Sequence, residues 1–159
     1  MRIAGDIFVR QPKPQTLKAW EPFWDCVDIL FEFQNSDIDD EHPEWRTNWI
    51  AGLALLRCVG HVLAKVDALT SSRHRTMIDA AYKAWKLPGQ ANDIFFGFIE
   101  NERNNILKTY TIGARIEIMN GNPTLIYGDG EDALQAYRLA VYWWRHQLEQ
   151  IEFQLENAR

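Results

Sequence analysis

The sequence lacks the features that mark several classes of protein. Among its 159 residues there are only nine Gly and six Pro, while 47% are hydrophobic and 13% aromatic, which excludes collagen-like and low-complexity proteins. The longest apolar run, Trp49 to Leu56, is much shorter than the ~20 residues that cross a bilayer, and Arg57 ends it. We therefore expect a single globular domain, residues 1–159, that does not span a membrane.

Cysteine is also scarce, and signals of secretion are missing. Cys26 and Cys58 form no C-x-x-C pair, and both fall in apolar segments with a helical pattern. Such thiols are more often small buried hydrophobes than partners in a disulfide. The first ten residues show neither a basic segment before an apolar one nor a small-residue cleavage site. These absences predict a protein of the reducing cytoplasm.

Most metal-binding and catalytic signatures are missing as well. No two of the four histidines share a helix face, and no Cys or carboxylate is spaced with them for zinc. The Gly128-Asp129-Gly130 stretch is too short to surround a phosphate and is interpreted as a turn before a helix. No G-x-S-x-G sequence accompanies a serine. We expect no metal and no cofactor, and a small-molecule enzyme is the least favoured class.

What is present predicts a mainly α protein. The prolines at 12 and 14 favour an extended arm over residues 1–15. After Gly113 the hydrophobic period changes from about 3.6 residues to about 2, which predicts a β-hairpin over residues 114–127. The fold class is an up-and-down bundle of about five helices with a small β-hairpin before the C-terminal helix. The helices are expected from Pro22 to before Asn35, from Pro43 to about Ala68, from Ser71 or Ser72 to Pro88, from Asn92 or Asp93 to Tyr110, and from Asp129 or Asp132 onward.

The C-terminal helix carries apolar residues at alternating spacings of three and four, from Leu134 to Leu155. Such a seam needs an antiparallel partner helix, in this chain or in a second copy. The adjacent Tyr142, Trp143 and Trp144 place aromatic rings on two faces of this helix. They are either a platform that stacks nucleic-acid bases or, as we favour, faces covered by the bundle and by a dimer partner. The sequence therefore predicts a homodimer.

The net charge of −5 is unevenly distributed. Residues 21–45 hold nine acids and no Lys or Arg, whereas residues 57–87 hold six basic residues and two acids. At about 100° per residue, Arg57, His61 and Lys65 fall on one side of their predicted helix. Two interpretations stay open for this basic stripe: a face that binds an anionic partner, and an ordinary solvated helix surface.

The segment from Glu100 to Tyr110, ENERNNILKTY, stands out. Helical geometry places Glu102 near the middle of an apolar stripe, where a charge is costly unless it is paired. On the structural interpretation, Glu102 makes an internal ion pair or hydrogen bond that holds the bundle in register. Arg103 and Tyr110 lie seven residues apart, nearly two turns, and are expected on one edge of the helix. These two residues on one edge of the helix are the basis of a functional interpretation of the segment.

Arg103-Asn104, followed by Lys108 and Tyr110, resembles the Arg-polar-x-x-x-His-x-Tyr motif of the HEPN superfamily, small helical proteins that include many ribonuclease toxins. The resemblance covers residues 103–110 specifically and the order of the helices from Pro22 onward more loosely. It departs from the family pattern at one position, because Lys108 stands where the family has its catalytic histidine.

The resemblance implies a dimer that binds or cleaves RNA without a metal, as a toxin or phage-defence component. Arg103 would hold the scissile phosphate, and Asn104 would position a phosphate oxygen or the 2′-hydroxyl. Tyr110 would bond the substrate or stack a base, and Lys108 would supply a supporting positive charge.

The missing histidine places cleavage in question, since an exposed lysine is almost wholly protonated at pH 7. We expect weak or no cleavage unless another residue replaces the histidine. His61 is the candidate, and Arg57, His61 and Lys65 are the predicted substrate-binding residues. The alternative is a non-catalytic helical module whose acidic residues 21–45 meet a basic protein partner, such as an antitoxin. The acidic pI of about 5.3 and Lys108 favour that alternative.

Overall fold

The computed structural model describes residues 15–39, 41, 43–89 and 93–157. Nearly all of the expected N-terminal arm, together with His42 and Asn92, lies outside these residues. The described part confirms the mainly α fold and the hairpin. In chain order its elements are α1 (Trp20–Asn35), α2 (Glu44–Lys65), the 3₁₀ turn η1 (Asp67–Leu69), α3 (Ser72–Trp85), the π-helical η2 (Ile94–Glu100), α5 (Asn101–Thr109), β1 (Ala114–Met119), β2 (Asn122–Tyr127), β3 (Glu131–Asp132) and α6 (Ala133–Asn157).

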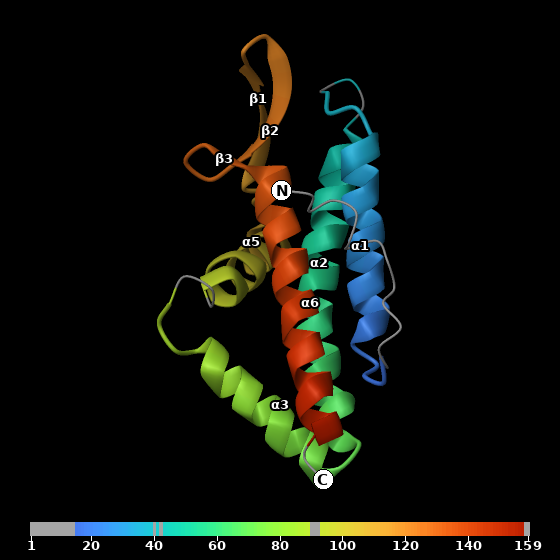
Figure 1. Cartoon of the computed structure of the whole chain (residues 1–159). Helices are drawn as coiled ribbons and strands as arrows, with labels where there is room; N and C mark the ends of the chain where they lie inside the picture. Colours follow the sequence, from blue (N-terminus) through green and yellow to red (C-terminus); the bar gives the residue numbers. More distant parts are fainter. Residues whose placement is uncertain (1–14, 40, 42, 90–92, 158–159) are drawn as a thin grey trace.

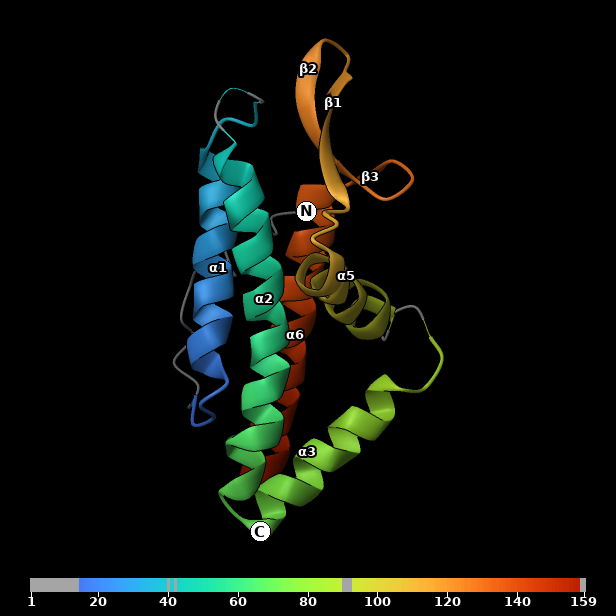
Figure 2. The same ribbon diagram turned by 180° about the vertical axis from the view of Figure 1, so that it is seen from behind.

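Three long helices form the body of the molecule. Helices α1, α2 and α6 lie side by side and each packs against the other two, and α3 slants away from their lower end (Figures 1 and 2). Helix α5 lies against α2, and the β1–β2 hairpin projects beyond the upper end of the bundle (Figure 1). The antiparallel partners that the α6 seam requires are α1 and α3 of the same chain.

Helix α2 is the core helix. Together with η1 it forms the stretch Glu44–Leu69, which among the described helices is the only one long and apolar enough, by composition alone, to cross a membrane. Its inward apolar side chains pack in the core, where Trp49, Leu53 and Leu56 are fully buried, whereas Val66 and Leu69 near the end of the stretch are exposed. Gly52 permits the closest approach to α6, since a Cβ atom there would lie 2.6 Å from Cε2 of Tyr137.

The aromatic faces of α6 are covered within the chain. Trp143 and Trp144 are both buried, and their ring centroids lie 5.1 and 5.3 Å from that of Trp85 on α3. Phe95 of η2 packs on the same rings, 5.7 Å from each. The expectation that a dimer partner or stacked bases cover these two tryptophans is therefore wrong, because α3 and η2 fold back onto them.

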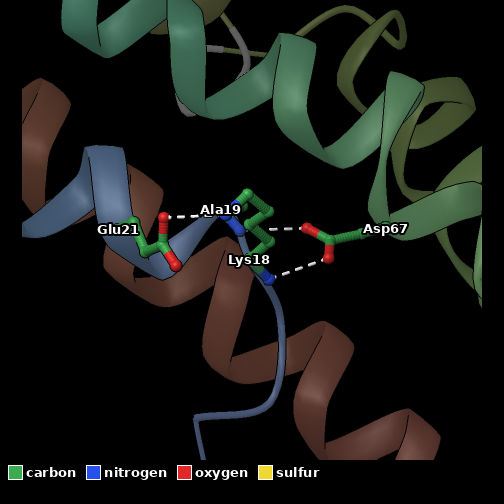
Figure 3. A network of polar contacts seen from close by, with 4 residues as sticks. All are labelled: Lys18, Ala19, Glu21 and Asp67. Atoms are coloured by element: carbon green, nitrogen blue, oxygen red, sulfur yellow. Dashed lines mark hydrogen bonds and ion pairs between the residues drawn. The ribbon is translucent and has the colours of Figure 1, made fainter.

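The start of α1 is held by carboxylates from distant parts of the chain. Asp67 of η1 accepts hydrogen bonds from the backbone N–H groups of Lys18 (2.8 Å) and Ala19 (3.0 Å), as Figure 3 shows. Glu152 of α6 accepts the N–H groups of Thr16 and Leu17 at 2.9 and 2.8 Å. Burial raises the pKa of Asp67. These bonds hold residues 16–19, the segment directly before α1, and the N–H groups of Trp20 and Glu21 bond to the carbonyl oxygens of Leu17 and Lys18 in that segment. The helix starts two residues before the predicted Pro22.

Local turn and capping residues define most other boundaries. Ser71 accepts a hydrogen bond from the N–H of His74 at the start of α3, and Asp132 accepts that of Gln135 at the start of α6. Between β1 and β2, Asn120 and Gly121 form a two-residue turn with φ of 51° and 79°, as a tight hairpin requires. The short β3 adds a third strand that the sequence pattern did not predict.

The predicted helix from 92 or 93 to Tyr110 is divided. A π-helical segment comes first, α5 follows it without a break, and α5 ends at Thr109. Tyr110 adopts a left-handed conformation, with φ of 52°, and its side chain is 66% exposed. The regular helix therefore ends one residue before Tyr110, so the helical geometry that places Tyr110 on the edge of Arg103 does not extend to it.

Candidate functional site

The inner face of α5 carries a buried carboxylate. Glu102 is 2% exposed, and its Oε1 accepts hydrogen bonds from Nε1 of Trp49 (3.3 Å) and from the backbone N–H of Gly113 (2.7 Å). One donor lies on α2, and the other lies at the entry to β1. Glu102 therefore joins three elements, which confirms the structural interpretation in its hydrogen-bonded form.

Gly113 is required by this arrangement. A Cβ atom at position 113 would lie 2.6 Å from Oε2 of Glu102 and 2.9 Å from Cε2 of Tyr127, and both distances are too short for real contacts. Burial, with smaller effects from Glu102 and Glu131, raises the pKa of Tyr127 to about 12. The inner face of α5 is thus closely packed and holds the hairpin against the bundle.

The outer face of α5 carries the residues of the HEPN-like motif. Arg103 and Asn104 are half-buried, and Nη1 of Arg103 donates a hydrogen bond of 2.9 Å to Oδ1 of Asn104. Lys108 is exposed near the end of the helix, and Tyr110 follows the last turn. The structure therefore places Arg103 and Asn104 together, and Tyr110 stands in a left-handed conformation directly after the helix.

Arg57 has partners inside the chain. Its side chain is 16% exposed, its Nη2 lies 3.8 Å from Oε2 of Glu100, and its Cζ lies 5.2 Å from the ring centroid of Phe95. An arginine held by a carboxylate and an aromatic ring is a fixed positive charge. Glu100 was not among the predicted site residues, although its position three residues before Arg103 places the two on neighbouring turns.

His61 connects the basic stripe of α2 with the motif on α5. It is exposed, and partial burial together with the charges of Arg57, Arg103 and Lys65, in that order, lowers its pKa from 6.5, while Glu100 acts in the opposite direction. The fold thus brings Arg103 within electrostatic range of His61, although the two residues are far apart in the sequence. A neutral histidine can accept a proton, and the cations around it can attract an anion.

The rest of the basic 57–87 segment is divided between structural and exposed residues. Arg73 donates a hydrogen bond from Nη2 to the carbonyl oxygen of Leu155 and so fixes the start of α3 to the end of α6. Lys65, Arg75 and Lys83 are exposed. The segment as a whole is therefore not a single basic face, and the part that can act with α5 is the group of Arg57, His61 and Lys65.

A hollow of about 530 Å³ lies on another side of η2, where the sequence pattern gave no indication of one. Phe98, Tyr127 and Leu139 contribute apolar surface to it, and acidic residues are also part of its lining. Its lining residues come from η2, β2, β3 and α6: Asp93, Ile94, Gly97, Phe98, Tyr127, Glu131, Asp132, Gln135, Ala136 and Leu139. An apolar surface with acidic residues around it suits a partner that combines apolar and basic groups.

Among residues 15–39, 41, 43–89 and 93–157, no group of three or more His, Cys, Asp or Glu side chains is placed to hold a metal ion. Cys26 is buried, Cys58 is half-buried, and both thiols are free. A comparison of the chain with protein-family models, with curated proteins and with solved structures gives no match, so its function is inferred from the geometry of the α2–α5 face.

Proposed function

We propose that this protein is a HEPN-like RNA-binding protein whose α2–α5 face binds the phosphate backbone, with His61 as its acid-base group. One observation carries the proposal: the fold gathers positive charge from two elements, with Arg57 on α2 held 3.8 Å from Glu100 and Arg103 on α5 held at 2.9 Å by Asn104, and both charges act on His61. A site that concentrates positive charge around a neutral histidine suits a phosphodiester.

The binding step rests on Arg103 and Lys65. A guanidinium has five N–H donors, and the bond to Asn104 uses one of those of Arg103. The others can hold two oxygens of one phosphate, and Lys65 can bind a neighbouring phosphate. Arg57 contributes its charge from a fixed position and needs no direct contact with RNA.

The chemical step requires a base near the 2′-hydroxyl. Neutral His61 would take the proton of that hydroxyl. The 2′-oxygen would then attack the phosphorus, and the bond between the phosphorus and the 5′-oxygen would break. The products are a 2′,3′-cyclic phosphate and a 5′-hydroxyl that takes its proton from solvent. Arg103 would stabilise the added negative charge on the phosphate oxygens. No metal takes part, and Lys108 serves only as a supporting cation.

The experiment measures binding and cleavage of labelled RNA with EDTA present. The variants are Arg103→Ala, His61→Ala and Lys108→His, and Arg46→Ala is the matched control because Arg46 is an exposed arginine near the other end of α2. We expect Arg103→Ala to weaken binding about tenfold, as expected for the loss of a phosphate clamp. Arg46→Ala should leave binding unchanged.

Each outcome separates binding from cleavage. Metal-independent cleavage that is lost in both Arg103→Ala and His61→Ala supports the ribonuclease assignment. If only Lys108→His cleaves, the protein binds RNA at this face but has lost the acid-base group. Absence of binding by all of these proteins would refute the RNA proposal. Under the proposal, the protein acts in the cytoplasm as a toxin or phage-defence component with a protein antitoxin.

A second candidate function is a non-catalytic module that binds a basic protein. The hollow between η2, β2 and α6 favours it, because Asp93, Glu131 and Asp132 surround an apolar floor. Leu139→Glu would place a charge on that floor. This variant should abolish capture of such a partner while leaving RNA binding at the α2–α5 face unchanged. If the variant still captures the partner but loses RNA binding, the hollow is excluded as the surface that binds the partner.

A further inference from the structure

The outer edge of β1 is available for pairing. In the described part of the chain the sheet order is β1-β2-β3, so one side of β1 bonds to β2 and the other side faces no strand. The hairpin projects beyond the helices in both views (Figures 1 and 2). The side chain of Ile118 on this strand is 67% exposed. An exposed edge with apolar side chains is a template for another strand.

The register shows which backbone groups point outward. Met119 and Asn122 close the two-residue turn, and in such a hairpin the closing pair is hydrogen-bonded and the pairs alternate from there. The next pair, Ile118 with Pro123, is then a non-bonded pair, which agrees with the missing N–H of proline. It follows that the N–H and C=O groups of Ile116 and Ile118 point away from β2.

The sequence of β1 is complementary to itself when it is reversed. An antiparallel pair with a two-fold axis at Ile116 places Arg115 opposite Glu117 of the second copy, and Glu117 opposite the second copy's Arg115. Within one chain, Nε of Arg115 donates to Oε1 of Glu117 at 2.8 Å and its Nη1 donates to the carbonyl oxygen of Gly128 at 2.7 Å, and the two side chains are 48% and 42% exposed. Pairing with a second copy therefore exchanges the ion pair within each strand for two ion pairs between the strands. Because the outward groups are those of Ile116 and Ile118, the Arg–Glu pairs occupy the non-bonded positions, where opposite side chains are closest.

We propose that β1 pairs with β1 of a second copy of this chain, in the antiparallel register centred on Ile116, and forms a continuous six-stranded sheet. Ile118 then lies opposite Ala114 of the second copy, and two Arg–Glu ion pairs flank the axis. The paired strands are short, so the dimer is expected to exchange with monomer and to depend on concentration. This proposal is independent of RNA binding and uses a different surface from the α6 aromatic face.

The symmetry gives a specific experiment with charge-reversed variants. Arg115→Glu and Glu117→Arg each place like charges opposite one another at two positions, and each should raise the dimer dissociation constant about tenfold. Mixed in equal amounts, the two variants should form a heterodimer. In this heterodimer, the carboxylate introduced at position 115 of one chain faces the guanidinium introduced at position 117 of the other. The second pair consists of the native Glu117 of the first chain and the native Arg115 of the other. Sedimentation velocity over a range of concentrations measures each species.

A backbone variant tests the register separately. Ile118→Pro removes an outward N–H and leaves the hairpin bonds intact, so it should abolish dimerisation, while Ile118→Val is the matched control that keeps the N–H and should dimerise. Far-ultraviolet circular dichroism checks that both variants fold. A wild-type chain that stays monomeric at every concentration would overturn the proposal. So would a dimer that Glu117→Arg and Ile118→Pro leave unchanged.

Discussion

Glu102 and Arg103 are adjacent in sequence, yet α5 directs their side chains into different environments. The carboxylate of Glu102 is enclosed and accepts hydrogen bonds from two groups of its own chain. The guanidinium of Arg103 is half-buried, and its charge extends to His61 on α2. The inner face therefore stabilises the fold, whereas the outer face holds charge that a ligand can use.

The comparison shows that polar residues on a helix are best sorted by their partners. A buried acid that accepts hydrogen bonds from its own chain needs no ligand to explain it. Basic residues from two helices that lower the pKa of one histidine repel its protonated form, and an anion between them would remove that cost.

The largest effect is expected from Glu102→Ala. It leaves Nε1 of Trp49 and the N–H of Gly113 without their acceptor and opens a cavity, so the free energy of unfolding should fall by about 3 kcal/mol. Chemical denaturation measures it. Glu102→Gln keeps an oxygen acceptor and should cost less. RNA affinity of the folded fraction should not change, and a selective loss of RNA binding would contradict the structural role of Glu102.

Gly113→Ala should have the next largest effect on stability. Its Cβ atom would lie 2.6 Å from Oε2 of Glu102, and forcing that contact apart should cost about 2 kcal/mol. Because the clash involves Glu102, the cost should shrink in the Glu102→Ala background. Denaturation of the two single variants and the double variant measures this coupling, and strictly additive costs would show that the two residues do not meet.

The order of the elements could be predicted from sequence because the patterns that define it are local. Pro43, Ser71 and the Asn120-Gly121 turn mark boundaries that depend on neighbouring residues only. The contacts of residues 16–19, which lead into α1, could not be predicted, because the carboxylates that accept their N–H groups, Asp67 and Glu152, come from far along the chain. The left-handed Tyr110 was also missed, since no glycine marks the end of α5.

The candidate site could be predicted only in part, for the same reason. Helical geometry on its own places Glu102 on a buried stripe and Arg57, His61 and Lys65 on one face of α2. The approach of Arg103 to His61 depends on how α5 packs on α2, and no local pattern encodes that packing. The Arg57–Glu100 pair likewise joins two separate elements.

Arg103→Ala should show the opposite pattern from Glu102→Ala. Its removal from a half-buried position should change the free energy of unfolding by only about 0.5 kcal/mol, whereas RNA affinity should fall about tenfold. The slope of log affinity against log salt should fall by about one. Fluorescence anisotropy at several salt concentrations measures both quantities. Equal effects on stability and binding would show that the two faces are not separable.

The smallest effect expected is a change in the pKa of His61, which is also the most direct test of the outer face. The charged groups around it are Arg57 and Lys65 on α2, Glu100 on η2 and Arg103 on α5. Arg103→Gln removes a positive charge and should raise this pKa, whereas Glu100→Gln removes a negative charge and should lower it. Proton NMR titration of the histidine ring measures both shifts.

The same lowered pKa determines the sign of two pH effects. Because the native state releases the His61 proton at a lower pH than the unfolded chain, this residue reduces stability as the pH falls below 6.5 toward its native pKa. Bound phosphate favours the protonated ring, so RNA affinity should instead rise over that interval, and His61→Ala should flatten the rise. An affinity that does not change with pH in the wild type would place RNA away from His61, and the α2–α5 face would then be a solvated surface.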